Sequence, residues 1–363
     1  MTREEAVGQG PLAGLKVLEF AGIGPGPHAA MLLSDLGADV LRIDREGGNG
    51  WPNPIVDRGR AGKVVDIRSP EGRDWCLQAA RLADVVIEGF RPGVMERLGL
   101  GPEVLCGENE RLIYGRITGW GQEGPLAQRA GHDVNYIALS GALAAMGRPG
   151  EPAAIPLNLV GDFGGGSMFL LLGILAALWE RERSGKGQVV DAAIIDGVAS
   201  MMTMFTGLAP SGRLSLDRAD NLLGGAAPFY RTYLCSDGGE ISVGPLEPAF
   251  FRSMMDRLGL SEWVSAQYDT SRWGGLTGVL AATFARWPRD HWAALFEGSD
   301  ACVFPVLTAQ EVADHPHHAA RASYIEHDGL MQAAPAPRLV RTPGRIRSSG
   351  DADRMIERWH TLA

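Results

Sequence analysis

Short apolar segments typical of strands alternate with helical segments over the first half of the chain, and no other feature constrains the fold as strongly. Residues 15–20 are typical of a strand and lead through a glycine- and proline-rich turn, residues 21–28, into a helical stretch. Strands that alternate with helices form parallel sheets, so we expect a large, doubly wound, mostly parallel α/β domain. Its strands are predicted at residues 15–20, 40–44, 64–67, 84–88, 111–117 and 188–193, and an apolar helix at residues 167–182.

The length of the chain indicates a second domain, because 363 residues exceed what one hydrophobic core usually supports. Residues 1–205 are expected to form the large domain, completed by residues 330–363. Residues 231–316 predict a smaller α+β domain, since two alternating segments there flank a Ser-Asp-Gly-Gly turn and form a hairpin. Linkers are predicted at residues 206–230 and 317–330, and an extended arm rich in Pro, Ala and Arg at residues 331–349.

Composition argues against several classes of protein. A net charge of −9 disfavours non-specific binding of nucleic acid. The four cysteines form no C-x-x-C pair, and Pro316 interrupts the cluster Asp314-His315-Pro316-His317-His318, so we expect no metal site. The longest apolar run, residues 168–179, is about half a membrane span and predicts a buried helix. The polar N-terminus has no apolar region typical of a signal peptide, so we expect a cytoplasmic protein without a membrane partner.

Four arginines lie at or just after the carboxyl ends of successive predicted strands: Arg45, Arg68, Arg91 and Arg97. Each alone is explained by solvation at the surface. Ligands of open α/β sheets bind at this edge, and guanidinium groups bind phosphates with two hydrogen bonds. The repeated arginines at the strand ends therefore indicate a polyphosphate site as strongly as they indicate solvated surface residues. A dinucleotide fingerprint is incomplete, because Pro27 stands where the third glycine of Gly22-x-Gly24-x-x-Gly would be.

His132 and Asp162 are the candidate proton carriers, and each follows a glycine near the predicted start of a helix. Either residue alone has a structural explanation, as a core histidine and as a helix N-cap. Asp133 likewise has a structural explanation, as the cap of a helix at residues 134–143, and its own N–H would then be free to stabilise an enolate oxygen. Removal of a proton next to a carbonyl needs a base with a pKa near neutrality, which an imidazole or a partly desolvated carboxylate provides.

The chain resembles the family III CoA-transferase superfamily along nearly its whole length, and within it the α-methylacyl-CoA racemases. Gly131-His132-Asp133 is the specific element, because the transferases share the later Gly161-Asp162 but carry a different residue at the histidine position. The other residues that carry the resemblance are Pro11 to Glu19, Ala21 to Pro27, Leu36 to Val40 with Arg45, Arg91 to Gly99, Thr118 to Pro125 and Asn158 to Asp162.

This resemblance implies a racemase that interconverts (R)- and (S)-2-methylacyl-CoA by proton transfer through an enolate, with no cofactor other than the CoA of its substrate. Asp162 and His132 would be the opposing acid/base residues, and Glu247 would pair with His132. An interlocked homodimer with active sites shared between subunits is also implied. The implied CoA contacts are Arg45, Val65, Asp66, Ile67, Arg68, Gly89, Phe90, Arg91, Arg97, Gly131, His132, Asp133, Val134, Asn135 and Tyr136.

Two other functions stay open from the sequence. A family III CoA-transferase would use Asp162 as a nucleophile that forms an acyl-enzyme anhydride, and His132 would be incidental. A nucleotide-dependent dehydrogenase would bind a nicotinamide cofactor at the glycine-rich turn.

Overall fold

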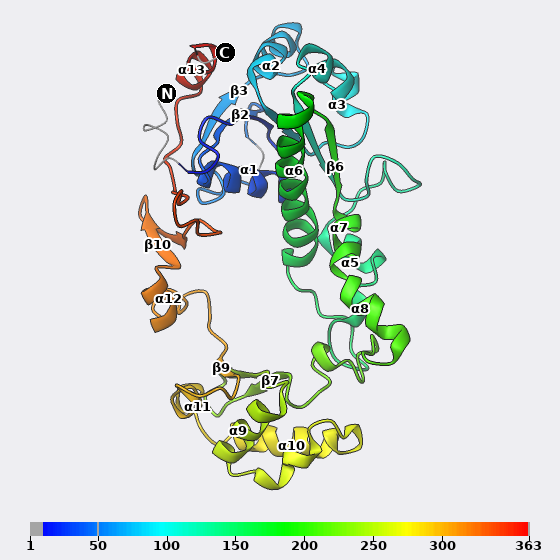
Figure 1. Cartoon of the computed structure of the whole chain (residues 1–363), viewed down its shortest axis with the longest axis vertical. Helices are drawn as coiled ribbons and strands as arrows, with labels where there is room; N and C mark the ends of the chain where they lie inside the picture. Colours follow the sequence, from blue (N-terminus) through cyan, green and yellow to red (C-terminus); the bar gives the residue numbers. More distant parts are fainter. Residues whose placement is uncertain (1–9, 49–50, 362–363) are drawn as a thin grey trace. The chain divides into compact units, whose positions relative to one another are not determined.

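The computed structural model describes residues 10–48 and 51–361, which divide into two compact units (Figure 1). Unit 1 comprises the described residues up to Ser140, Pro156–Met201 and those from Pro316 onward. Unit 2 comprises Gly141–Ile155 and Met202–His315. The domain and linker boundaries expected from the sequence stay predictions.

A six-stranded sheet forms the centre of unit 1 in the described part of the chain, with strand order β3-β2-β1-β4-β5-β6. Every pairing between neighbouring strands is parallel. The expected parallel α/β sheet is therefore confirmed. The strands are β1 (Lys16–Phe20), β2 (Asp39–Asp44), β3 (Arg60–Val64), β4 (Val85–Glu88), β5 (Ile113–Thr118) and β6 (Val189–Ala193).

The expected position of the third strand was wrong. The prediction placed it at residues 64–67, but β3 runs from Arg60 to Val64, and Val65 donates the last bond to Asp44 of β2. Because β3 contains Gly62 and Lys63, its sequence lacks the apolar pattern typical of a buried strand. Val65 and Ile67 are apolar because they pack against the core from the loop after β3, and this loop was therefore mistaken for a strand.

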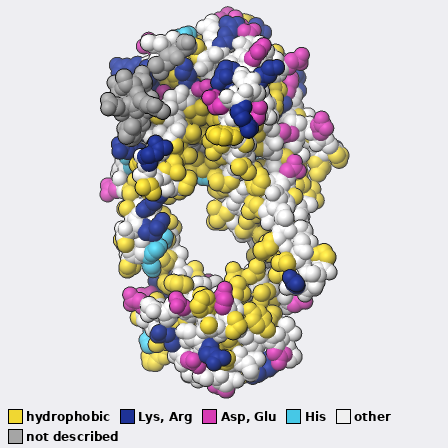
Figure 2. Space-filling model, viewed as in Figure 1, with side chains coloured by type: hydrophobic (Ala, Val, Ile, Leu, Met, Phe, Trp, Pro, Cys, Tyr) yellow, Lys and Arg dark blue, Asp and Glu magenta, His cyan; other side chains and the backbone are white. Residues whose placement is uncertain are grey.

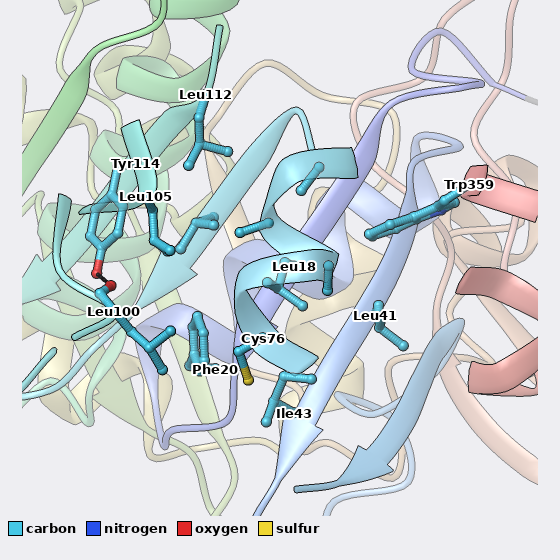
Figure 3. Close-up of a cluster of buried hydrophobic side chains, with 14 of the residues drawn as sticks. Leu18, Phe20, Leu41, Ile43, Cys76, Leu100, Leu105, Leu112, Tyr114 and Trp359 are labelled. Carbon is cyan, nitrogen blue, oxygen red and sulfur yellow. Dashed lines mark hydrogen bonds between the residues drawn. The ribbon is translucent and has the colours of Figure 1, made fainter. Parts of the chain in front are cut away.

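Both faces of the sheet are covered, because neighbouring residues of each strand contribute to different clusters of buried side chains. Leu18, Leu41 and Val86 pack with α2 (Pro70–Leu82) and the C-terminal helix α13 (Ala352–Thr361), whose Trp359 is fully buried (Figure 3). Val17, Val40, Val85 and Ile113 pack with α1 (Pro25–Asp35) and α6 (Met168–Ser184) instead. Strands of a parallel sheet enclosed in this way are apolar on both sides, which explains their continuous apolar runs.

The helices of unit 1 begin at recognisable signals. Proline stands in the first turn of α1, α2 and α4, and the Ser69 hydroxyl accepts a hydrogen bond from the Gly72 N–H at the start of α2. These helices are α1 (Pro25–Asp35), α2 (Pro70–Leu82), α3 (Val94–Arg97), α4 (Pro102–Glu108), α5 (Asp133–Leu139), α6 (Met168–Ser184), α7 (Ile194–Met201), α12 (Pro316–Arg321) and α13 (Ala352–Thr361).

Helix α6 is buried on one side only. Leu170, Leu171 and Ile174 pack on the sheet, whereas Leu172 and Trp179 are exposed. Together with the preceding π-helix η2 (Leu159–Ser167), it forms a helical run of 26 residues, long and apolar enough to cross a membrane by length and composition alone. Its contacts with β5 and β6 make it a layer of the α/β unit.

Unit 2 contains the expected hairpin, because β7 (Arg231–Leu234) pairs antiparallel with β8 (Glu240–Val243). A third antiparallel strand, β9 (Val303–Pro305), extends this sheet. Aromatic side chains fill its core, including Phe229, Phe251 and Phe284. The α-helices of this unit are α8 (Thr203–Leu208), α9 (Pro248–Leu258), α10 (Trp273–Phe284) and α11 (Arg289–Phe296).

The chain returns to unit 1 through the antiparallel pair β10 (Tyr324–His327) and β11 (Leu330–Ala333). Arg58 anchors this return, since its guanidinium pairs with Asp35 at 2.5 Å and donates to the Gln332 amide oxygen at 2.8 Å. The first residues of the expected extended arm therefore lie in a strand. From there to α13 the arm has no regular structure.

Loss of one partner of the buried ion pair between Arg60 and Glu19 is expected to destabilise unit 1 strongly. Both side chains are 1% exposed, and their shortest contact is 2.5 Å. Replacing Arg60 with Met leaves a buried carboxylate without its main partner, which typically costs about 3–5 kcal/mol of unfolding free energy. Chemical denaturation of wild type, Arg60→Met and the double variant Arg60→Met/Glu19→Gln measures this, and the double variant is expected to recover part of the loss.

Arg81→Ala is the control, because Arg81 and Glu108 form a pair in which both side chains are largely exposed, 52% and 40%. Such a pair contributes less than about 1 kcal/mol. An Arg60→Met variant that loses no more stability than Arg81→Ala would contradict the assignment.

Candidate active site

A cavity of about 2020 Å³ lies in unit 1 at the carboxyl ends of the sheet strands. Its wall is built from the loops that follow the strands, because all strands of a parallel sheet end at the same edge. The lining segments after β1, β2, β3, β4 and β5 are residues 21–24, 45–47, 65–68, 89–92 and 119–120.

All four arginines singled out in the sequence line this cavity. Arg45 donates to the Gly48 carbonyl at 2.6 Å, and Arg68 pairs with Asp66 at 3.0 Å while its side chain stays 81% exposed. Arg97 ends the short helix α3, and Arg91 lies three residues before that helix. Four cations around one cavity, three on loops after different strands and one on α3, suit a ligand with several phosphate groups.

The buried ion pair between Glu88 and Arg116 contacts both the loop that carries Arg91 and the helix that carries Arg97. Glu88, at the end of β4, is 1% exposed and accepts hydrogen bonds from the Phe90 N–H at 2.7 Å and from Arg116 at 2.9 Å. Arg116 also pairs with Glu96 of α3 at 2.9 Å. Burial raises the pKa of Glu88, and the Phe90 N–H and the Arg116 guanidinium oppose that rise. This pair orders the loop and the helix that carry Arg91 and Arg97.

His132 is the N-cap of α5, with an extended backbone at φ −132°. Its N–H donates to the Asn135 side-chain oxygen at 3.0 Å, which closes the first turn. The explanation of Asp133 as the cap of this helix is wrong, because Asp133 is already the first helical residue. Its carboxylate instead accepts a hydrogen bond from the Asp162 N–H. The helix also ends earlier than expected, at Leu139 instead of residue 143.

The loop before His132 is held by aromatic packing. Tyr136 of α5 donates its hydroxyl to the Gly131 carbonyl and contacts the Trp120 ring edge-to-face at 4.8 Å between centroids. Both rings lie against Gly131, where a Cβ atom would come within 2.8 Å of Tyr136. Trp120, from the segment Thr118 to Pro125 that carries the family resemblance, also lines the cavity but was not among the predicted site residues.

Asp162 lies inside the π-helix η2 and is not the N-cap of the next helix, as one reading of the sequence expected. Its carboxylate accepts a hydrogen bond from the Asn158 amide at 3.3 Å. Burial raises the pKa of Asp162 above its ordinary value and the Asp133 carboxylate raises it further, whereas Asn158 and His132 lower it. A partly desolvated aspartate of this kind is closer to the pKa of a general base than a solvated one.

Glycines allow the segment that carries Asp162 to pack closely against the backbone of α7 and of the loop before α1. A Cβ atom on Gly197 of α7 would lie 1.9 Å from the Gly165 carbonyl oxygen, so only hydrogen permits this contact. Gly24, at φ +71°, brings its backbone close to the Asp162 carboxylate, since a Cβ there would lie 3.3 Å from Oδ2. The Gly197 contact thus fixes the segment that follows Asp162, and Gly24 brings backbone next to the Asp162 carboxylate itself.

The cavity brings together most of the site residues named from the sequence. Asp133, Val134 and Asn135 do not line it, and Glu247 belongs to unit 2, where it is the N-cap of α9. The named residues that line the cavity are Arg45, Val65, Asp66, Ile67, Arg68, Gly89, Phe90, Arg91, Arg97, Gly131, His132, Tyr136 and Asp162. Their catalytic and binding roles stay predictions. The described residues contain no group of three His, Cys, Asp or Glu side chains able to hold a metal ion.

A large cavity at the carboxyl edge of a parallel sheet, lined by arginines and by a histidine and an aspartate, is typical of an α/β enzyme acting on a phosphate-rich substrate. The chain belongs to CoA-transferase family III, whose model matches residues 12–350. An acyl-CoA substrate follows from this membership.

Known relatives include both racemases and transferases. The chain is 43% identical to the α-methylacyl-CoA racemase of Mus musculus over 334 residues, which cover 92% of this chain and 87% of that protein. It is 31% identical to the acetyl-CoA:oxalate CoA-transferase of Acetobacter aceti, over 89% of this chain and 87% of the relative. The crystal structure of a CaiB/BaiF family protein from Brucella suis matches 98% of this chain and all of that chain with a TM-score of 0.82 and 28% identity.

The raised pKa of Asp162 predicts how Asp162→Asn changes stability with pH. A carboxyl group whose pKa is higher in the folded state destabilises that state once it is ionised. Below the ordinary pKa of an aspartate both states are protonated and the penalty is absent; it develops as the pH rises through the folded-state pKa. Asp162→Asn is thus expected to raise the melting temperature of unit 1 at pH 7, with a gain that disappears towards pH 3.

Calorimetry of both proteins between pH 3 and 8 measures this difference, with Asp220→Asn as the control because Asp220 is exposed. A melting temperature that Asp162→Asn lowers at neutral pH would contradict the burial argument.

Proposed function

We propose that this protein is a racemase of 2-methylacyl-CoA thioesters. The observation that carries the proposal is the placement of His132, from the Gly131-His132-Asp133 element, and Asp162 in the wall of one cavity. The identity of 43% to a racemase over most of both chains supports it. A transferase needs the carboxylate alone, whereas inversion at carbon needs a proton carrier on each face of the substrate.

The proposed reaction is a proton transfer between two faces of one carbon. Asp162 or His132 removes the α-proton, and the electron pair of the C–H bond moves to the thioester oxygen, giving an enolate. The protonated form of the other residue then returns a proton to the opposite face. By family resemblance, His132 serves the S substrate and Asp162 the R substrate.

The start of α5 is proposed to stabilise the enolate; its N-cap His132 lines the cavity, although the Asp133 side chain does not. The Asp133 N–H belongs to the first turn of the helix, and no described residue accepts a hydrogen bond from it. A free N–H at a helix N-terminus stabilises a developing negative charge on oxygen. The arginines at the strand ends are proposed to bind the phosphates of CoA, so the thioester is held by groups remote from the reacting carbon.

A family III CoA-transferase is the second candidate. The relatedness to a transferase from Acetobacter aceti and the Asp162 carboxylate beside Gly24 both fit it. In that reaction the Asp162 carboxylate would attack the thioester carbonyl and release CoA, forming an anhydride. A second acid would be required as acceptor, which the racemase reaction does not need.

Deuterium exchange distinguishes the two candidates. A single enantiomer of a 2-methylacyl-CoA incubated with the protein in D2O is expected to gain deuterium at the α-carbon and to lose optical purity, with no acceptor acid present. His132→Ala and Asp162→Asn are each expected to lower racemisation by a factor of about 100 or more, the usual contribution of a general acid or base.

In contrast, each of these variants is expected to keep exchange of the one enantiomer that its remaining base deprotonates. Mass spectrometry and chiral chromatography of the hydrolysed acid measure both quantities. CoA exchange that appears only when an acceptor acid is added, with no α-exchange, would establish the transferase.

An interlocked homodimer stays a proposal, and helix α6 supports it. Met168, Leu172, Leu175 and Trp179 are spaced at i, i+4, i+7 and i+11, so they form one stripe along the helix, and all four are exposed. Apolar side chains gather on the surface where α6 lies in the same view (Figure 2). A second copy of the chain is the proposed occupant, through which Glu247 of one subunit would reach His132 of the other. Cytoplasmic location also stays a prediction.

Charged residues in the α6 stripe are expected to separate the subunits. Leu172 and Trp179 are 62% and 71% exposed, so Leu172→Glu/Trp179→Glu changes the surface without creating a cavity. Light scattering after size exclusion is expected to show a dimer for wild type and a monomer for the double variant. Gln78→Glu, at an exposed position of α2, is the control and should stay dimeric. A monomeric wild type would contradict the homodimer.

A further inference from the structure

The carboxylate of Asp133 contacts the backbone of the other candidate base. Oδ2 accepts a hydrogen bond from the Asp162 N–H at 2.7 Å, although the two residues are 29 positions apart in sequence. Asp133 is only 7% exposed, and its Oδ1 has no hydrogen-bond partner among the described residues. A half-paired buried carboxylate is costly. The hydrogen bond from the Asp162 N–H is therefore the main interaction that compensates for the burial of the Asp133 carboxylate.

The Asp133 carboxylate packs directly against the backbone of Gly161. A Cβ atom on Gly161 would lie 2.4 Å from Oδ2 of Asp133, so any other residue at position 161 would displace the contact. The Asp162 N–H lies in the first turn of η2, where N–H groups have no acceptor within their own helix. Asp133 supplies that acceptor, and its negative charge is favourable at a helix N-terminus.

One residue thus connects both candidate bases. Asp133 follows His132 directly in the chain, and through its side chain it holds the main chain of Asp162. We propose that Asp133 is a positioning residue, whose carboxylate fixes the Asp162 main chain relative to His132 and so aligns the two proton carriers across the substrate. This rests on the proposed racemase function for its catalytic part, whereas the contact itself does not.

The contact is tested without any substrate by hydrogen–deuterium exchange of the peptide around Asp162. Asp133→Ala removes the acceptor, so the Asp162 amide is expected to exchange at least tenfold faster than in wild type. Asp133→Asn keeps an oxygen at the same position and is expected to retain most of the protection. Unchanged exchange in Asp133→Ala would overturn the proposal, whatever the enzyme does.

The catalytic part is tested by combining Asp133→Ala with each single-base variant. In the His132→Ala background only Asp162 can exchange the α-proton, and Asp133→Ala is expected to slow this exchange at least tenfold. In the Asp162→Asn background only His132 acts, and the same substitution is expected to slow exchange less than threefold. Equal losses on both faces would overturn the positioning role, because a general structural defect affects both bases alike.

Asp35→Ala is the matched control. Asp35 is a buried carboxylate paired with Arg58, and it does not line the cavity. It is expected to lower stability without changing the ratio of the two single-face rates. If wild type shows no α-exchange with any 2-methylacyl-CoA, the racemase function fails, and the amide exchange of Asp162 still decides whether Asp133 holds the Asp162 main chain.

Discussion

The parallel pairing of six strands is the constraint on which the candidate site depends. Parallel strands must all end at one edge, so the loops that follow them meet there whatever their sequences are. Arg45, Arg68 and Arg91 are far apart in the chain, yet each follows a strand and each lines the same cavity. Burial of both faces of the sheet keeps this edge fixed, because the strands cannot shift without opening two cores.

Close backbone packing shapes the segment that carries the candidate base Asp162. The segment that carries Asp162 is a π-helix, and Gly165 contacts Gly197 of α7 at a distance that no side chain would permit. Burial of the Asp162 carboxylate raises its pKa. Electrostatic balance comes from the neighbours, since Asp133 opposes the ionisation of Asp162 and His132 favours it.

Much of this could be predicted from the sequence, and the limits have physical causes. The parallel sheet and the strand-end arginines follow from short-range patterns, which is why they were found. The third strand was misplaced because Val65 and Ile67 are apolar for packing from a loop, while Gly62 and Lys63 belong to the strand. The π-helix around Asp162 depends on contacts with α7, which no local pattern encodes, although the run Gly164 to Gly166 was a sign of close packing.

Asp133 shows why the role of a side chain is harder to predict than that of a motif. Its position before a helix favours an N-cap, which is a local interaction. The structure instead gives that position to His132 and turns the Asp133 carboxylate towards the Asp162 main chain. A transferase that uses the aspartate as nucleophile needs only that one group in place, whereas a racemase needs two groups on opposite faces of one carbon. On the proposed function, the His132 and Asp162 segments must therefore keep a fixed position relative to each other, and the buried carboxylate of Asp133 connects them.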